Sequence, residues 1–202
     1  DFLDKADNSF ETDDWFDYDT MVDFYETVGN CPMKFKQRMF KEQPEKYSEF
    51  IIYLYDYDKK EFIDEGKFLE YFLNDENPDI REYLAEKGHF LDELMADPFV
   101  SVICAVVRQN HKLDELVYSG YTSVRREVAR MGYGLDILKR DAHLEVKLQV
   151  CELGYDLNYF LYSEDNYLRK NAEFLQKRFE RENLKPFIND FGFEVYYDVF
   201  KL

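Results

Sequence analysis

Apolar and polar positions recur along the chain with an offset of 22 residues. The repeat is carried by four segments, which are IREYLAEKGHFLDEL from Ile80, VICAVVRQNHKLDEL from Val102, VRREVARMGYGLDIL from Val124 and VKLQVCELGYDLNYF from Val146. Similar residues coincide in columns, such as Leu91/Leu113/Leu135/Leu157, Asp92/Asp114/Asp136/Asn158 and Gly88/Asn110/Gly132/Gly154. One more unit fits upstream through Phe62 and Gly66, and a degraded unit fits downstream through Leu168, where the Gly is lost. A fixed period of this length is typical of stacked repeat proteins.

Each unit is predicted to be a pair of short helices. Val124 and Val128 have helical spacing, which predicts an amphipathic helix of about ten residues. Gly132 falls where this helix should end, because Gly readily adopts the left-handed conformation of a helix C-terminus. Asp136 is then placed to cap a short second helix. Since one unit cannot bury its apolar stripe alone, the pattern predicts an all-α fold, an α-solenoid of stacked helix pairs.

The units resemble HEAT-type repeats, in the compressed form of bacterial leucine-rich-repeat-variant arrays. An acid followed six positions later by a base supports the resemblance, as in Asp75/Arg81 and Asp141/Lys147. In HEAT arrays a similar pair forms a ladder between units, and here the ladder is incomplete, with Ser119, Ser163 and Ile103 as the exceptions. The resemblance implies an extended surface that binds other macromolecules, and it implies no chemistry of its own.

The basic column of the repeat has two interpretations. Its members are Arg81, Arg125, Lys147 and Arg169. They could line an anion-binding groove of the kind with which HEAT-like glycosylases grip DNA. However, the acids Asp75 and Asp141 would neutralise part of the column, so the pattern favours an internal ladder of ion pairs.

Two different segments flank the array, which is expected to span residues 58–180. Residues 1–57 are predicted to form an acidic, aromatic N-terminal cap of helices, and residues 1–27 alone hold ten acids and one base. Residues 181–202 are predicted to form a small aromatic cap. Within it, the turn signal Asn189-Asp190-Phe191-Gly192 lies between strand formers, which leaves open a β-hairpin or a simple aromatic cover. Repeat arrays need such caps for solubility.

Charge changes the picture, because 43 Asp and Glu against 26 Lys and Arg give a net charge of −17. The excess is lopsided, with −16 in residues 1–97 and −1 in residues 98–202. This balance excludes a nonspecific nucleic-acid binder, which needs a basic face, and an anionic membrane surface as a ligand. Disorder is excluded as well, since 46% of the residues are hydrophobic and 18% are aromatic. No window approaches eighteen apolar residues, so no membrane-spanning segment is expected.

No pattern indicates catalysis, a metal or a cofactor. His89 and His111 share one repeat column, which predicts turn residues rather than metal ligands, and no His-x₃-His or Cys-x₂-Cys spacing occurs. The Gly132-Tyr133-Gly134 segment lacks the Lys and Ser or Thr of a phosphate loop. Three dispersed cysteines, Cys31, Cys104 and Cys151, argue against disulfides and for a reducing compartment. We expect Cys151 in the core and Cys104 at the surface.

The sequence therefore predicts a non-enzymatic inhibitor whose acidic surface occupies the basic nucleic-acid-binding region of a partner enzyme. In size, charge and aromatic content the chain resembles acidic anti-defence proteins of phages, which implies a partner such as a CRISPR nuclease and a location in the bacterial cytoplasm. The predicted partner-binding residues are Asp13, Asp14, Trp15, Asp17, Asp19, Asp23, Glu26, Asp64, Glu65, Asp75, Glu76, Asp79, Glu82 and Glu86. The alternatives are a repeat scaffold or toxin-immunity protein that binds by shape, and a HEAT-like DNA glycosylase.

Overall fold

The computed structural model describes residues 33–42, 51 and 54–196. Within these residues the fold is all-α apart from one two-stranded sheet, as the sequence predicts. The chain divides into two compact units, residues 1–75 and 76–202. No helix in the described part of the chain is both long enough and apolar enough to cross a membrane.

The described part of the first unit contains three helices, α3 (Met33–Glu42), α5 (Asp56–Asp64) and α6 (Leu69–Phe72). Phe40 and Phe62 are buried against each other, with their ring centroids 5.9 Å apart in an edge-to-face arrangement. The same unit buries two ion pairs, Lys36–Asp58 and Lys59–Asp75. Helix α3 confirms a helix within the predicted N-terminal cap, and residues 1–32 of that cap lie outside the described residues.

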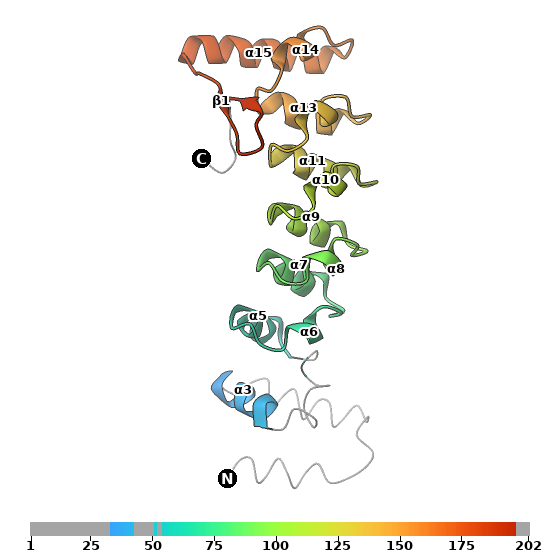
Figure 1. Ribbon diagram of the computed structural model, residues 1–202, viewed down its shortest axis with the longest axis vertical. Coiled ribbons are helices and arrows are strands. Elements are labelled where there is room, and N and C mark those ends of the chain that lie inside the picture. The colour runs from blue at the N-terminus through green and yellow to red at the C-terminus, as the bar shows by residue number, and fades with distance from the viewer. Residues whose placement is uncertain (1–32, 43–50, 52–53, 197–202) are drawn as a thin grey trace. The chain divides into compact units, whose positions relative to one another are not determined.

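The second unit alternates longer and shorter helices. The longer ones are α7 (Pro78–Glu86), α9 (Val100–Arg108), α11 (Thr122–Arg130), α13 (Leu144–Glu152) and α15 (Asn166–Glu182). The shorter ones are α8 (Leu91–Leu94), α10 (Leu113–Leu116), α12 (Leu135–Leu138) and α14 (Leu157–Leu161). Each longer helix packs on the next, from α7 to α15 (Figure 1). The 22-residue period of the sequence is therefore the spacing of one longer and one shorter helix.

The core of the second unit lies between successive longer helices. Val102, Val106, Val124 and Val128 have no exposed surface. They occupy the columns whose helical spacing predicts an apolar stripe. Full burial of one such side chain contributes roughly 1.5–3 kcal/mol relative to an exposed one, so repetition of these columns stabilises every unit in the same way.

The glycine column ends the longer helices. Gly132 has a φ of 81°, and the backbone N–H of Tyr133 after it donates to the Val128 carbonyl at 3.2 Å. This is the Schellman arrangement, in which a left-handed residue lets the last carbonyls find donors. Gly88 and Gly154 repeat it with φ values of 81° and 75°. The predicted role of this column is confirmed.

The predicted helix cap at Asp136 is wrong. The residue before α12 is Gly134, which has a φ of 62° and makes no side-chain cap. Asp136 is the second residue of the helix itself. Phe90, Lys112 and Asp156 take the left-handed position of Gly134 in the other units. The short helices therefore begin directly after a second left-handed residue, which leaves the carboxylate of Asp136 available for other contacts.

The degraded last unit differs because its glycine is missing. Gln176 occupies the column of Gly154, and α15 continues through it for a length of 17 residues. The helix ends only at Asn183, which takes the left-handed conformation with a φ of 50°. Asp165 caps its N-terminus by accepting from the N–H groups of Tyr167 and Leu168.

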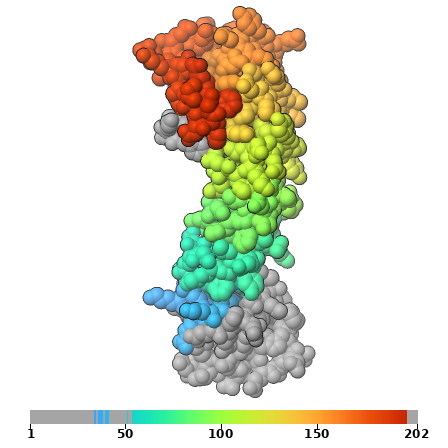
Figure 2. Space-filling model, viewed as in Figure 1, coloured from blue at the N-terminus to red at the C-terminus, as the bar shows by residue number. Residues whose placement is uncertain are grey.

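A β-hairpin follows α15, which decides between the two alternatives for the C-terminal segment. Strands β1 (Phe187–Ile188) and β2 (Glu194–Val195) pair antiparallel across the predicted turn. The hairpin lies against the units that contain α11 and α13 (Figures 1 and 2). Two backbone contacts hold it there, from Asn189 Nδ2 to the Gly132 oxygen at 2.9 Å and from the Tyr196 N–H to the Leu153 oxygen at 2.8 Å.

Candidate functional site

The basic column of the repeat forms ion pairs, but in a register that the sequence analysis did not predict. Arg81 pairs with Asp97 at 2.7 Å, and Arg125 pairs with Asp141 at 2.6 Å. In both pairs the acid follows the base by 16 residues and belongs to the next unit. Lys59 and Asp75 repeat the same spacing in the first unit, at 2.7 Å. The ladder is thus confirmed in kind, while the expected pairs at a spacing of six are wrong.

The acid of each pair has a second structural task. Asp97 accepts the backbone N–H of Phe99, and Asp141 accepts that of His143, both at 2.8 Å. In the same column the hydroxyl of Ser119 accepts the N–H of Tyr121 at 3.3 Å. This column therefore shapes the loop before each longer helix, and the carboxylates in it are committed to structure.

This commitment corrects one predicted partner-binding residue. Asp75 is only 3% exposed and pairs with Lys59, so we remove it from the proposed partner surface. Glu82 is half-buried and pairs with Arg108 at 2.9 Å. Glu86 is exposed, with its carboxylate 3.3 Å from the same guanidinium. The arginine partly neutralises both glutamates.

The other predicted acids fall into two groups. Asp64, Glu65, Glu76 and Asp79 are exposed. Glu65 bonds to Lys67 at 2.9 Å, and this hydrogen bond, followed by one from Gln37, lowers the pKa of the Glu65 carboxyl. The predicted residues Asp13, Asp14, Trp15, Asp17, Asp19, Asp23 and Glu26 lie outside the described residues.

The structure places a further set of carboxylates on the short helices of successive units. We name this set the acidic row, and its members are Asp92, Glu93, Asp114, Glu115 and Asp136. All five are exposed. The sequence analysis missed the row because it assigned the Asp column to helix capping. The signal was nevertheless present in the repeated Leu-Asp-Glu-Leu of α8 and α10.

Two members of the acidic row have hydrogen-bond partners from the next unit. Asp92 lies 2.7 Å from the Lys112 ammonium and 3.0 Å from His111 Nε2, and the bond from Lys112, followed by that from His111, lowers its pKa. Asp136 accepts the Tyr155 hydroxyl at 2.6 Å, which is the main reason that its pKa is lowered. Burial and then this same bond raise the pKa of Tyr155 to about 12. The row therefore stays ionised at neutral pH.

The hairpin builds a cleft beside the acidic row. Phe191 packs edge-to-face on Tyr133 with ring centroids 5.3 Å apart, and Phe193 packs in the same way on Tyr155 at 5.5 Å. A cleft of about 360 Å³ lies between the hairpin and the short helices α10 and α12. We name it the aromatic cleft, and its main lining residues are Tyr118, Tyr133, Phe191, Phe193, Asp114 and Asp136.

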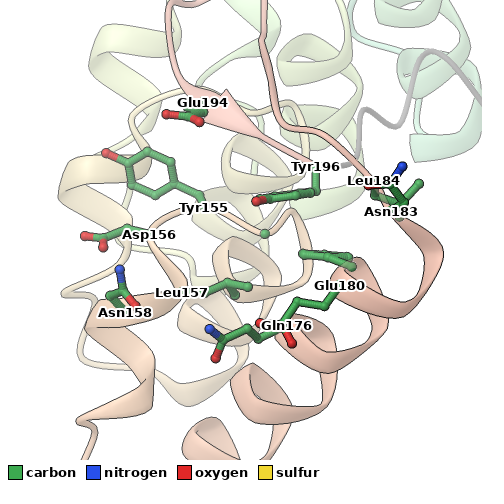
Figure 3. A pocket seen from close by; sticks show the side chains of 12 residues that line it. Tyr155, Asp156, Leu157, Asn158, Gln176, Glu180, Asn183, Leu184, Glu194 and Tyr196 are labelled. Carbon is green, nitrogen blue, oxygen red and sulfur yellow. The ribbon is translucent and has the colours of Figure 1, made fainter.

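A second cleft, of about 510 Å³, lies between the hairpin, α14 and α15 (Figure 3). The ring of Tyr196 stacks on Phe179 there, with centroids 4.2 Å apart. The charged residues among the described lining are all acidic, namely Asp156, Glu180 and Glu194. Both clefts beside the hairpin are therefore suited to a cationic ligand rather than to an anion.

The described residues do not assemble the groups of a nucleophilic or metal centre. Burial raises the pKa of the Cys151 thiol to about 12, and burial followed by the charge of Glu127 raises that of Cys104. Both thiols are therefore protonated at neutral pH. Cys151 is buried, as expected, whereas Cys104 is half-buried rather than at the surface. No group of three potential metal ligands occurs in the described part of the chain. His111 lies in a turn, as predicted.

Comparisons with known proteins yield no family for the chain. No protein-family model matches it, and no significant match is found among the curated proteins or the solved structures.

Proposed function

We propose that the chain is a non-enzymatic inhibitor that binds a partner protein through an acidic surface. The acidic row carries this proposal, because it presents exposed carboxylates at one position of successive helix pairs. A regular array of like charges attracts a basic surface over a long range and sets its register. In this proposal the helix pairs form an α-solenoid whose short helices face the partner.

The partner that we propose is an enzyme with a basic nucleic-acid-binding region, such as a CRISPR nuclease in a bacterial cytoplasm. Occupying that region would prevent the nucleic acid from binding. The exposed acids Asp64, Glu65, Glu76 and Asp79, and those of residues 1–27, add to the negative surface.

A direct nucleic-acid ligand, as in a DNA glycosylase, is disfavoured by the ion-pair ladder. Arg81 and Arg125 each donate two hydrogen bonds to a carboxylate of the next unit. These guanidinium groups are therefore already neutralised, and their column does not provide the basic face that phosphate binding requires.

Recognition by shape, as in a scaffold or immunity protein, has an observation of its own. Tyr118 and Tyr162 share one repeat column and are 69% and 89% exposed. Aromatic side chains of this kind often anchor protein interfaces. Such recognition would depend weakly on salt, whereas the acidic row predicts strong dependence.

The test measures displacement of fluorescent DNA from a purified CRISPR nuclease at increasing salt. Changing Asp92, Glu93, Asp114 and Glu115 together to Asn or Gln should weaken inhibition at least tenfold and reduce its salt dependence. The matched control makes the same change at Glu145, Glu152, Glu164 and Glu173, which are exposed on other helices, and should inhibit like the wild type. Equal losses in the two variants would show that net charge alone acts, and unchanged inhibition in both would reject the acidic row.

A further inference from the structure

The aromatic cleft combines features that rarely occur together on a protein surface. Four aromatic rings and two carboxylates line it, and none of its described lining residues is basic. Val117 and Gly134 are the buried residues of the lining. Asp114 and Asp136 are exposed, as is Tyr118. The cleft is thus apolar at its base and negatively charged at its rim.

The aromatic rings that come from the hairpin are held in place by the fold. The side-chain oxygen of Asn189 accepts the N–H groups of Phe191 and Phe193 at 3.1 and 2.9 Å. Its amide nitrogen donates to Gly132 at 2.9 Å, which ties the turn to the end of α11. The rings of Phe191 and Phe193 also rest edge-on against tyrosines of two units. The faces of the cleft are therefore positioned before any ligand arrives, which lowers the entropic cost of binding.

The two carboxylates retain acceptor capacity. The bonds that Asp136 accepts from Tyr155 and Lys139 both fall on Oδ1, and within the described residues its Oδ2 accepts none. Asp114 makes no hydrogen bond or ion pair with the described part of the chain. The nearest ammonium, that of Lys139, is fixed between Asp136 at 3.0 Å and Asp156 at 2.8 Å. Lys139 is only 7% exposed and does not line the cleft.

We propose that the aromatic cleft binds an arginine side chain of the partner protein. An arginine fits both parts of the cleft, because its planar guanidinium stacks on aromatic rings and its N–H groups bond to carboxylates. A lysine ammonium matches less well, since it is strongly hydrated and lacks a plane to stack. This inference rests on the proposed function, to which it adds a specific anchor within the acidic row.

The test titrates the protein with three blocked nine-residue Gly/Ser peptides that carry one central Arg, Lys or citrulline, and follows it by NMR. The Arg peptide should shift the resonances of Tyr118, Tyr133, Phe191 and Phe193. The double variant Tyr118→Ala/Asp114→Asn should weaken this binding at least fivefold. The control variant Tyr162→Ala/Glu164→Gln removes the same groups from the end of α14 and should bind like the wild type, because neither residue lines the cleft. Citrulline keeps the shape and loses the charge, so that peptide should not bind.

Three results would overturn the arginine assignment. They are equal binding of the Lys or citrulline peptide, shifts spread over the acidic row without the cleft rings, and unchanged affinity of the double variant. The proposed function fails on a different reading, namely DNA displacement by the protein that does not respond to the four substitutions in the acidic row. A protein that keeps its salt-dependent inhibition while the peptides do not bind would retain the function and lose the cleft.

Discussion

Arg125 and Asp141 lie 16 residues apart in sequence, yet the guanidinium of Arg125 donates to both carboxylate oxygens of Asp141, at 2.6 and 3.0 Å. The same guanidinium donates to the backbone oxygen of Ser119, six residues before it, at 2.7 Å. Ser119 and Asp141 are equivalent positions of successive units. One arginine therefore connects the starts of two repeats, which fixes the spacing of the helix pairs.

Removing the acid of this connection should destabilise the protein. We expect Asp141→Ala to lower the free energy of unfolding by about 2–3 kcal/mol, because it leaves the mostly buried Arg125 guanidinium and the His143 N–H without their acceptor. Urea denaturation measures the change. Asp114→Ala is the control, since that exposed acid lacks such partners in the described part of the chain, and it should stay within about 0.5 kcal/mol of the wild type. Equal effects of the two substitutions would contradict the structural role of the pair.

The same pair predicts how stability depends on pH. Burial acts to raise the pKa of Asp141, but hydrogen bonds from Arg125 and His143 outweigh it, so the pKa lies below its ordinary value. A depressed pKa contributes stability above the unfolded pKa, near 3.9, and this contribution is lost as the pH falls through the lower folded value. The difference in unfolding free energy between wild type and Asp141→Asn should be constant above about pH 5 and shrink below about pH 4. Urea titrations across this range test it, and a constant difference would refute it.

The repeat and its helix ends could be predicted from sequence because they depend on local properties. Gly132 ends α11 through its own backbone freedom, and Val124 and Val128 are buried because of their helical spacing. The partner of Arg125 could not be predicted in this way, since it depends on how one helix packs on the next. The observed register also explains a pair of exceptions. Ile103 and Ser119 stand 16 residues apart, so the base and its acid are lost together.

The candidate site was less predictable than the fold. Charge indicated an acidic partner surface, but Asp75 and the members of the acidic row look alike in sequence. Only burial separates them, with Asp75 inside the first unit and Asp92 exposed. The aromatic cleft depends on the hairpin, whose Phe191 and Phe193 meet tyrosines that lie 58 and 38 residues earlier in the chain. No local pattern encodes such a contact.

The register makes a constructive prediction at Ser163. Lys147 stands 16 residues before it and belongs to the basic column, so an acid at this position should meet the ammonium. We expect Ser163→Asp to raise the free energy of unfolding by about 0.5–1 kcal/mol. A double-mutant cycle with Lys147→Met separates this pair from the general benefit of an acid near the start of α15. Ser163→Asn is the uncharged control. A gain that persists with Met at position 147 would reject the pairing.

Two glycines of one column should respond differently to alanine. Gly88 and Gly154 both have a left-handed backbone, with φ values of 81° and 75°. A Cβ at Gly88 meets no described atom within 4 Å, whereas one at Gly154 would lie 2.8 Å from Tyr196 and 2.9 Å from Phe179. Gly88→Ala should therefore cost about 1 kcal/mol, from backbone strain alone. Gly154→Ala should cost about 1–3 kcal/mol more, because the stacked rings that hold the hairpin must move. Urea denaturation measures both losses. Protease cleavage within residues 185–196 should also accelerate in Gly154→Ala and not in Gly88→Ala, and equal behaviour of the two variants would show that the glycine does not position the hairpin.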